Sequence, residues 1–293
     1  MRNVFDQLFK DLASELLSPW GTAQPALAVV SDAQEADLVF EPSRRTATVR
    51  ERELGLFGRM TNTVCLLEAF HATPDRDEVL DCIRKQLTLH RQRTTGGKPR
   101  GEVISLWVIS SGRPEGVLRG LALDRMPGWG PGFYRAKLEH LPVRLVVVSE
   151  LPVSTQSLLL RLMGTKKVLK AAVGELKHLP PGMFMRRVAT DVLARLRLQL
   201  ERKTGPLEAE EEELLMITDA EFQVWKQSIV EESVLQALRR VIREMYEEHS
   251  GAMPRSLASR LDLVTDEAEL GRLNRLAASR PANEFEQALP KKR

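Results

Sequence analysis

Two carboxylates lie where an apolar strand would not ordinarily carry a charge. Asp37 interrupts the strand-like stretch Glu35 to Phe40, and Glu68 directly follows the apolar run Val64 to Leu67. An ionised carboxylate is costly to bury unless it is paired, bound to a metal ion or close to water. All three states remain open for Glu68. For Asp37, the alternative to chemistry is a structural role, such as capping a loop or pairing with an arginine.

Gln86 and His90 are two further polar side chains in an apolar setting. The residues after Glu68 predict an amphipathic helix, with Thr73 as its N-cap and Pro74 at its first position. At about 100° per residue, Gln86 and His90 fall near the middle of its apolar face. That face consists of Val79, Leu80, Cys82, Ile83, Leu87 and Leu89. Either Gln86 faces Glu68 across one site, or it satisfies backbone groups or bound water, as most buried polar groups do.

The end of this helix and the loop after it are basic. From Arg84 to Gly101 there is no Asp or Glu, and the cationic residues are Arg84, Lys85, Arg91, Arg93, Lys98 and Arg100. Such a stretch can follow a nucleic-acid backbone, and it can equally complement the helix dipole and be solvated. Other catalytic patterns are missing, because no GxSxG, HExxH or GxGxxG motif stands in a suitable context.

The elements that must position these side chains change character along the chain. Hydrophobic spacing predicts a first helix from Val4 to Leu17 and, besides the strands with Asp37 and Glu68, strands at Glu102 to Ile109 and Val143 to Val148. From about Ser154 onward only helical periods remain. We therefore expect an α/β domain at residues 1–152, a helical extension at 153–206 and a C-terminal helical region at 207–293.

Several boundaries follow from local signals. The stretch Pro25 to Arg52 predicts strand segments broken at Pro25, at Pro42 and at a turn from Ser43 to Arg45. The acidic run Glu208 to Glu213 predicts a solvated connection. Thr218 and Glu221 predict a capping box that opens a long helix at about residues 219–249. The broad apolar stripe of that helix must pack on its own helical region or on a second copy of the chain.

Composition limits the partners and the cellular compartment that we expect for the protein. The 293 residues carry a net charge of +3, which does not by itself indicate nucleic-acid binding. Cys65 and Cys82 both fall in apolar patterns, which favours free buried thiols over a disulfide or metal site. The N-terminal segment lacks the pattern of a signal peptide, and no run approaches 18 apolar residues. We therefore expect a cytoplasmic protein without a membrane partner.

The order of these elements resembles the core of the PD-(D/E)XK nucleases. More specifically, the chain is similar to the bacterial recombination-promoting nuclease and transposase-like (Rpn-like) family. The likeness runs over most of the chain, in FDQLFKDL (Phe5 to Leu12), EADLVF (Glu35 to Phe40), LLEAFH (Leu66 to His71), the helix with Gln86, ELPVSTQSLLLRLMG (Glu150 to Gly164), VLKAAVGEL (Val168 to Leu176) and the tail Arg243 to Ser279. It implies a restriction-endonuclease-like mixed sheet flanked by helices, followed by an α-helical C-terminal region.

The resemblance also implies a reaction and its residues. In that family an Asp and a Glu bind a divalent metal ion at the edge of a sheet, and a Lys two residues after the Glu assists the attacking water. Asp37 and Glu68 match the two metal ligands, and Gln86 matches a helix glutamine of many related nucleases. The cofactor would be Mg²⁺ or Mn²⁺. The residues that would contact DNA are Lys85, Arg91, Arg93, Lys98 and Arg100.

One position departs from the family pattern. Phe70 occupies the lysine position, and an apolar ring can neither stabilise a phosphate transition state nor hold a water nucleophile. Helical geometry turns Lys85 away from the apolar face, and His71 lies on the opposite face of the strand, so neither is expected to replace the lysine. Two functions remain open: a Mg²⁺-dependent DNA endonuclease, and an inactive nuclease-fold protein that uses its C-terminal helices for oligomerisation or for binding a protein partner.

Overall fold

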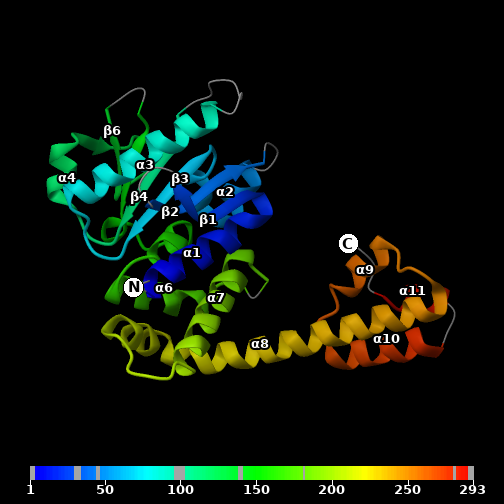
Figure 1. The fold of residues 1–293 in the computed structure, drawn as a ribbon. Coiled ribbons are helices and arrows are strands. Elements are labelled where there is room, and N and C mark those ends of the chain that lie inside the picture. Colours follow the sequence, from blue (N-terminus) through cyan, green and yellow to red (C-terminus); the bar gives the residue numbers. More distant parts are fainter. Residues whose placement is uncertain are drawn as a thin grey trace. The chain divides into compact units, whose positions relative to one another are not determined.

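The computed structural model describes residues 4–29, 34–43, 47–95, 103–137, 141–180, 182–279 and 282–289. The chain divides into two compact units, Met1–Phe222 and Gln223–Arg293, with the boundary inside one long helix. Figure 1 shows a sheet with flanking helices in the first unit and helices in the second. The division into three parts that the sequence suggests stays a prediction.

The first unit is built around a mixed sheet. Its described residues form seven strands in the order β1-β2-β3-β4-β7-β6-β5. They are β1 (Gly21–Val29), β2 (Gln34–Pro42), β3 (Cys65–Phe70), β4 (Ser105–Ser110), β5 (Leu123–Arg125), β6 (Phe133–Ala136) and β7 (Val143–Val147). The parallel strands β3, β4 and β7 are largely buried, which explains their continuous apolar runs. The expected α/β class is confirmed.

Strands β1 and β2 form a long antiparallel hairpin at one edge of the sheet. The strand break expected at Pro25 does not occur, because an edge strand tolerates a residue that cannot donate a ladder hydrogen bond. Pro42 is the last residue of β2, as expected. The turn predicted at Ser43 to Arg45 lies mostly outside the described residues. The Gly/Pro-rich segment after β5 leads into β6, which pairs with β7 and extends the opposite edge.

Helices pack on both faces of the sheet (Figure 1). Helices α3 (Arg76–Thr95) and α4 (Glu115–Gly120) pack on one face, and their core includes Val79, Cys82, Leu66, Val108 and Leu145. Helices α1 (Val4–Leu17) and α7 (Phe184–Glu201) pack against each other on the other side, next to β1 and β2. The bounds of α1 agree with the prediction. The sheet that carries Asp37 and Glu68 thus lies between two layers of helices.

The start of α3 differs from the sequence prediction. The N–H of Glu78 donates to the Asp75 carboxylate at 2.9 Å, and the N–H of Asp75 donates to the Glu78 carboxylate at 2.8 Å. This reciprocal pair is a capping box. Asp75 therefore caps the helix, and the N-cap predicted at Thr73 is two residues too early. Asp and Glu both accept at this end, whereas Thr73 offers only a hydroxyl.

Helix α2 (Ala47–Met60) was not expected. Its first turns contain the β-branched residues Thr48 and Val49, which favour strands, and the pattern was therefore interpreted as strand-like. The helix kinks at Gly55, where φ is 58°. A Cβ at this position would lie 2.5 Å from the carbonyl oxygen of Gln156. Gly55 thus allows both the left-handed backbone and the close approach of a neighbouring loop.

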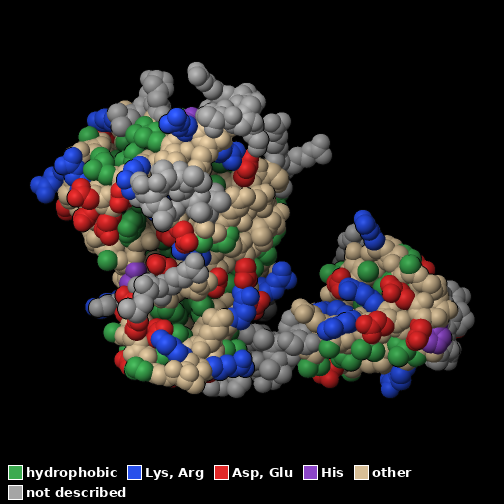
Figure 2. All heavy atoms as spheres, viewed as in Figure 1, with side chains coloured by type: hydrophobic (Ala, Val, Ile, Leu, Met, Phe, Trp, Pro, Cys, Tyr) green, Lys and Arg blue, Asp and Glu red, His purple; other side chains and the backbone are tan. Residues whose placement is uncertain are grey.

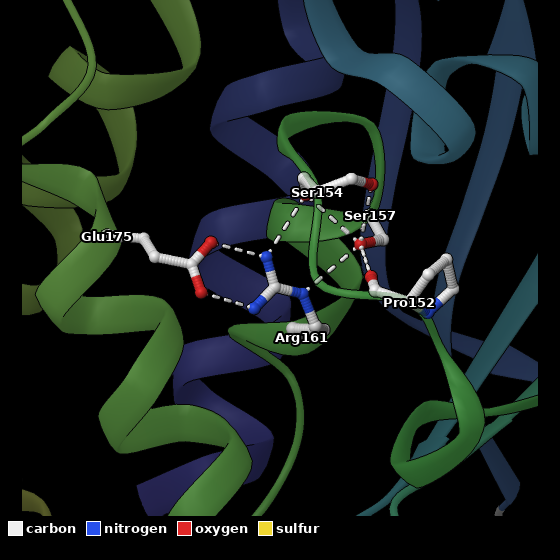
Figure 3. Close-up of polar contacts among 5 residues, drawn as sticks. All are labelled: Pro152, Ser154, Ser157, Arg161 and Glu175. Carbon is white, nitrogen blue, oxygen red and sulfur yellow. Dashed lines mark hydrogen bonds and ion pairs between the residues drawn. The ribbon is translucent and has the colours of Figure 1, made fainter.

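A buried arginine fixes that loop (Figure 3). Arg161, on α5 (Leu158–Arg161), is 2% exposed and donates two hydrogen bonds of 2.6 Å to Glu175 on α6 (Lys166–Leu176). It also donates to the carbonyl of Ser154 at 3.1 Å and to the hydroxyl of Ser157 at 3.2 Å. The hydroxyl of Ser157 in turn donates to the carbonyl of Pro152. We call these five residues the arginine clamp.

The second unit is helical and has its own core. It contains the C-terminal part of α8 (Ala209–Ser250) with α9 (Arg255–Leu261), α10 (Glu267–Ser279) and α11 (Ala282–Ala288). Its buried apolar side chains are Ile242, Tyr246, Leu257, Leu261, Val264, Leu270, Leu273, Ala277, Phe285 and Leu289. Arg239, on α8, donates to the carbonyl of Val264 in the connection between α9 and α10 at 2.8 Å. The helical C-terminal region expected from the sequence is confirmed in its secondary structure.

Helix α8 begins earlier than predicted. Most of the acidic run Glu208 to Glu213 forms its first turns instead of a solvated connection, because carboxylates suit the positive end of a helix. Thr218 lies inside the helix, where its hydroxyl donates to the carbonyl of Leu214 at 2.8 Å. The capping box predicted there does not form. Among the helices of the described residues, none has the length and apolar character needed to cross a membrane.

Candidate functional site

Asp37 and Glu68 meet across two neighbouring strands. Strand β2 pairs antiparallel with β3, with Leu38 opposite Leu67 and Val39 opposite Leu66. The alternation of side chains places Asp37, Leu66 and Glu68 on the face covered by α3. The two acids are interlocked through the backbone: the N–H of Asp37 donates to Glu68 Oε1 at 3.4 Å, and the N–H of Ala69 donates to Asp37 Oδ2 at 3.0 Å. The structure therefore brings the two predicted metal ligands together.

Lys85 reaches this pair from α3, contrary to the sequence prediction. Its Nζ lies 2.8 Å from Glu68 Oε2, and the two side chains are 15% and 4% exposed. Lys85 is three residues after Cys82 and four before Leu89, which are both buried, so it stands at the margin of the packed face. A four-carbon stem can run along apolar surface and deliver its charge at the end. Helical angle alone therefore gave the wrong expectation.

Helix α1 brings two more charged groups to the site. Lys10 Nζ lies 3.3 Å from Asp37 Oδ1, and the two side chains are 13% and 20% exposed. Asp6, one helical turn earlier, interacts electrostatically with both Lys10 and Asp37. Neither residue was singled out from the sequence. Their i, i+4 spacing on an otherwise apolar helix face was the available signal, but it is also a common surface pattern.

These charges alter one another's proton affinity. Burial, and then repulsion by Asp37, raises the pKa of Glu68 to about 7, although Lys85 acts in the opposite direction. Burial, followed by the charge of Asp37, also raises the pKa of Asp6. Burial is the largest single influence on Lys85 and acts to lower its pKa, but the charge and hydrogen bond of Glu68, together with Cys82 and Asp37, leave that pKa raised. Shifts of this origin are typical of functional sites, and structural ion pairs show them as well.

Gln86 does not face Glu68. Its side-chain nitrogen donates to the carbonyl of Ile104 at 2.5 Å and approaches the carbonyl of Pro142 at 3.4 Å. These carbonyls directly precede β4 and β7, whereas Glu68 lies toward the other end of the parallel strands. Gln86 is completely buried. It therefore satisfies backbone groups, which was the alternative interpretation, and the expectation that it faces Glu68 across one site is wrong.

The position where the family has its lysine, at the end of β3, holds the apolar Phe70. Phe70 packs against the apolar core on the α3 side. The ring of His71 stacks on Phe5, with centroids 3.7 Å apart and planes inclined by 9°. These rings border a shallow hollow that Asp6, Ala69 and Met163 also line, and the hollow has room for about one water molecule.

Two of the basic residues from Arg84 onward also pair with acidic side chains. Arg93 makes two hydrogen bonds to Glu41, at 3.0 and 2.7 Å, and Arg84 lies 3.4 Å from Asp81. Arg91 is exposed, and Lys98 and Arg100 lie outside the described residues. On the face of the first unit that Figure 2 shows, basic and acidic side chains are intermixed. The predicted DNA contacts of this stretch stay a prediction.

The acid pair suits the metal ion that the resemblance implies. Across the part of the chain that the structure describes, no group of three or more His, Cys, Asp or Glu is placed to hold a metal ion. Two carboxylates are nevertheless enough for Mg²⁺, which usually keeps several of its waters. Asp37 and Glu68 supply hard oxygen ligands within one partly solvated site. The donor set therefore fits Mg²⁺ or Mn²⁺.

Comparisons with other proteins add no relative. No protein-family model matches the chain, and neither a curated protein nor a solved structure matches it. What the site can do must therefore be inferred from its own residues.

Proposed function

We propose that the first unit is a divergent PD-(D/E)XK nuclease that hydrolyses DNA phosphodiester bonds with Mg²⁺ or Mn²⁺. The observation that carries this proposal is the convergence of Asp37, Glu68 and Lys85 from three different elements, β2, β3 and α3. Two carboxylates and an ammonium group are the set that the family uses. The mixed sheet with helices on both faces is compatible with a restriction-endonuclease-like core.

Each of the three side chains has a separate task in this proposal. Asp37 and Glu68 hold the ion, and the backbone N–H of Ala69 fixes one oxygen of Asp37. Lys85 supplies from α3 the positive charge that Phe70 cannot supply from β3. A divalent ion bound there would lower the pKa of its water and neutralise charge on the phosphate. Lys85 would orient that water and stabilise the charge that develops.

The surroundings of the acid pair favour a polymer as substrate. The hollow that Asp6 and Ala69 line has room for about one water molecule, so it cannot enclose a nucleotide. Asp37 is 20% exposed and gives the site its contact with solvent. A phosphodiester within a strand that lies across the surface can reach such a site, whereas a small free substrate would find few enclosing walls.

Cleavage of supercoiled plasmid tests the proposal. The purified wild-type chain, with Mg²⁺ or Mn²⁺ varied from micromolar to millimolar, is expected to nick or linearise the plasmid. Asp37→Ala and Glu68→Ala should each reduce the rate by about 10³-fold, because both ligands are needed to hold the ion. Glu53→Ala is the control, since Glu53 also pairs with a cationic side chain, Arg52, but lies on α2.

A folded wild type that cuts no DNA with either metal would overturn this function. In that case the inactive alternative gains support, in which the fold is retained as a scaffold and the helical second unit binds a partner or a second copy. Linear and single-stranded DNA should be included, so that a requirement for supercoiling is not mistaken for inactivity.

A further inference from the structure

The acid pair already carries its own cations. Lys85 contacts Glu68 Oε2 at 2.8 Å, and Lys10 contacts Asp37 Oδ1 at 3.3 Å. Each carboxylate therefore has one lysine, and the lysines come from helices on opposite sides of the sheet, α3 and α1. Among these four side chains, two positive charges balance two negative charges without any metal ion, and Asp6 adds a further carboxylate nearby.

We propose that Lys10 is a built-in counterion that a divalent metal ion displaces from Asp37, whereas Lys85 stays with Glu68. The inference rests on the proposed function, because it concerns how the ion enters the same site. Lys10 is thereby a positioning residue, which holds Asp37 in place until the ion arrives and competes with the ion for one oxygen.

The oxygens of the two acids show why Lys10 is the one that leaves. Asp37 Oδ2 accepts the N–H of Ala69 at 3.0 Å, so Oδ1, which no backbone group fixes in this way, is the oxygen of Asp37 better placed for a metal ion. Lys10 lies against that oxygen. Its contact is longer than that of Lys85, and Asp37 is 20% exposed compared with 4% for Glu68. An ion arriving from solvent therefore meets Asp37 and Lys10 first.

Asp6 gives the displaced lysine another partner. It stands four residues before Lys10 on α1, a spacing at which oppositely charged side chains can pair. Asp6 already interacts electrostatically with Lys10 and with Asp37. Lys10 can thus turn from Asp37 toward Asp6 without leaving its charge unpaired. Such an exchange costs less than burying a free ammonium group.

Manganese binding tests the proposal without depending on DNA cleavage. Free Mn²⁺ is measured by electron paramagnetic resonance in titrations of the wild type and variants at pH 8 and low salt. Lys10→Met is expected to bind Mn²⁺ about five- to tenfold more tightly, because both a competitor and a like charge are removed. Lys10→Arg keeps the charge and should stay within about twofold of the wild type. Asp37→Ala should lose the binding.

The control and a second readout separate this role from a purely structural one. Lys203→Met removes a lysine that is paired with Glu211 away from the site, and it should leave Mn²⁺ affinity as in the wild type. In thermal unfolding, Lys10→Met should melt at a lower temperature than the wild type without metal. Saturating Mn²⁺ should raise its melting temperature more than that of the wild type.

Each outcome decides between the two ideas. Tighter Mn²⁺ binding by Lys10→Met in a chain that does not cut DNA supports the counterion role and removes the nuclease function. DNA cleavage by the wild type, with equal or weaker Mn²⁺ binding by Lys10→Met, overturns the counterion role and leaves the nuclease function standing. Absence of Mn²⁺ binding in both the wild type and Lys10→Met overturns the counterion role.

Discussion

Two carboxylate–cation pairs in the first unit are built in opposite ways. In the arginine clamp, Glu175 receives two hydrogen bonds from Arg161, and these bonds are the main reason why the pKa of Glu175 is lowered. In the acid pair, Glu68 has Lys85 as its cation, but burial and then Asp37 raise its pKa to about 7. The surroundings of Glu175 stabilise its anionic form, and those of Glu68 destabilise its anionic form.

The difference is the one expected between a structural contact and a site with the function proposed here. The arginine clamp satisfies its buried charge with a carboxylate and two loop oxygens, and the result is a fixed loop. Placing Asp37 beside Glu68 adds repulsion that stability alone does not require. Repulsion between neighbouring carboxylates is expected where a site must bind a ligand that the chain itself does not supply. The comparison therefore supports assigning chemistry to the acid pair and architecture to the clamp.

The largest effect should come from Lys85. Lys85→Met is expected to lower the rate of plasmid cleavage at saturating Mn²⁺ by about 10²- to 10³-fold, because it removes the positive charge near the reacting phosphate. Lys85→Arg should recover part of the rate, since it keeps the charge with a different shape. Initial rates measured over a range of Mn²⁺ concentrations separate turnover from metal affinity. A Lys85→Met variant that cuts within twofold of the wild-type rate would remove Lys85 from the proposed mechanism.

In the arginine clamp, a substitution is expected to lower the stability of the fold. Glu175→Ala leaves Arg161 buried without its carboxylate partner, which should lower the free energy of unfolding by about 3 kcal/mol. Urea denaturation of both proteins measures this difference. Glu53→Ala, which breaks the exposed pair with Arg52, should cost less than about 1 kcal/mol. Equal losses in the two variants would show that the clamp is no stronger than a surface ion pair.

The sequence singled out both acids, but it did not show that they meet, and it did not identify the cations beside them. Strand alternation placed Glu68 with Leu66, and the apolar surroundings of Asp37 marked it as unusual, but the register that joins them comes from the pairing of β2 with β3. Lys85 was expected to contact DNA and not Glu68, because an angle on a helical wheel ignores the reach of a long side chain. Lys10 was missed because it looks like an ordinary charged residue at the margin of an amphipathic helix.

Gln86 shows a second kind of limit. Periodicity correctly placed it on the packed face of α3, where it is completely buried. Periodicity does not say which neighbouring groups a side chain on that face will meet. Gln86 follows Lys85 by one residue but points about 100° further round the helix, where it meets the carbonyls of Ile104 and Pro142 instead of Glu68. The prediction missed helix α2 because its β-branched residues and glycines disfavour a helix locally. Tertiary packing overrides that local preference.

A smaller effect tests whether Gln86 has a structural role, as the arginine clamp has, or takes part in metal binding at the acid pair. Gln86→Leu should lower the free energy of unfolding by about 2 kcal/mol, because the carbonyl of Ile104 loses its buried donor. Its Mn²⁺ affinity should equal that of the wild type. Gln92→Leu, at an exposed position of the same helix, should change stability by less than about 0.5 kcal/mol. Loss of Mn²⁺ binding in a stably folded Gln86→Leu variant would return Gln86 to the site.

The smallest effect depends on pH and concerns the charge of Glu175 alone. Glu175→Gln keeps the shape of the side chain and should be less stable than the wild type by about 1 kcal/mol at pH 7. Because folding lowers the pKa of Glu175, the stability from its charge is present above the ordinary glutamate value of about 4.3. That stability is lost as the pH falls through the lower pKa of the folded state. The difference between the two proteins, measured by urea unfolding from pH 7 down to pH 3, should therefore shrink in acid. A constant difference would mean that shape, and not charge, holds the clamp.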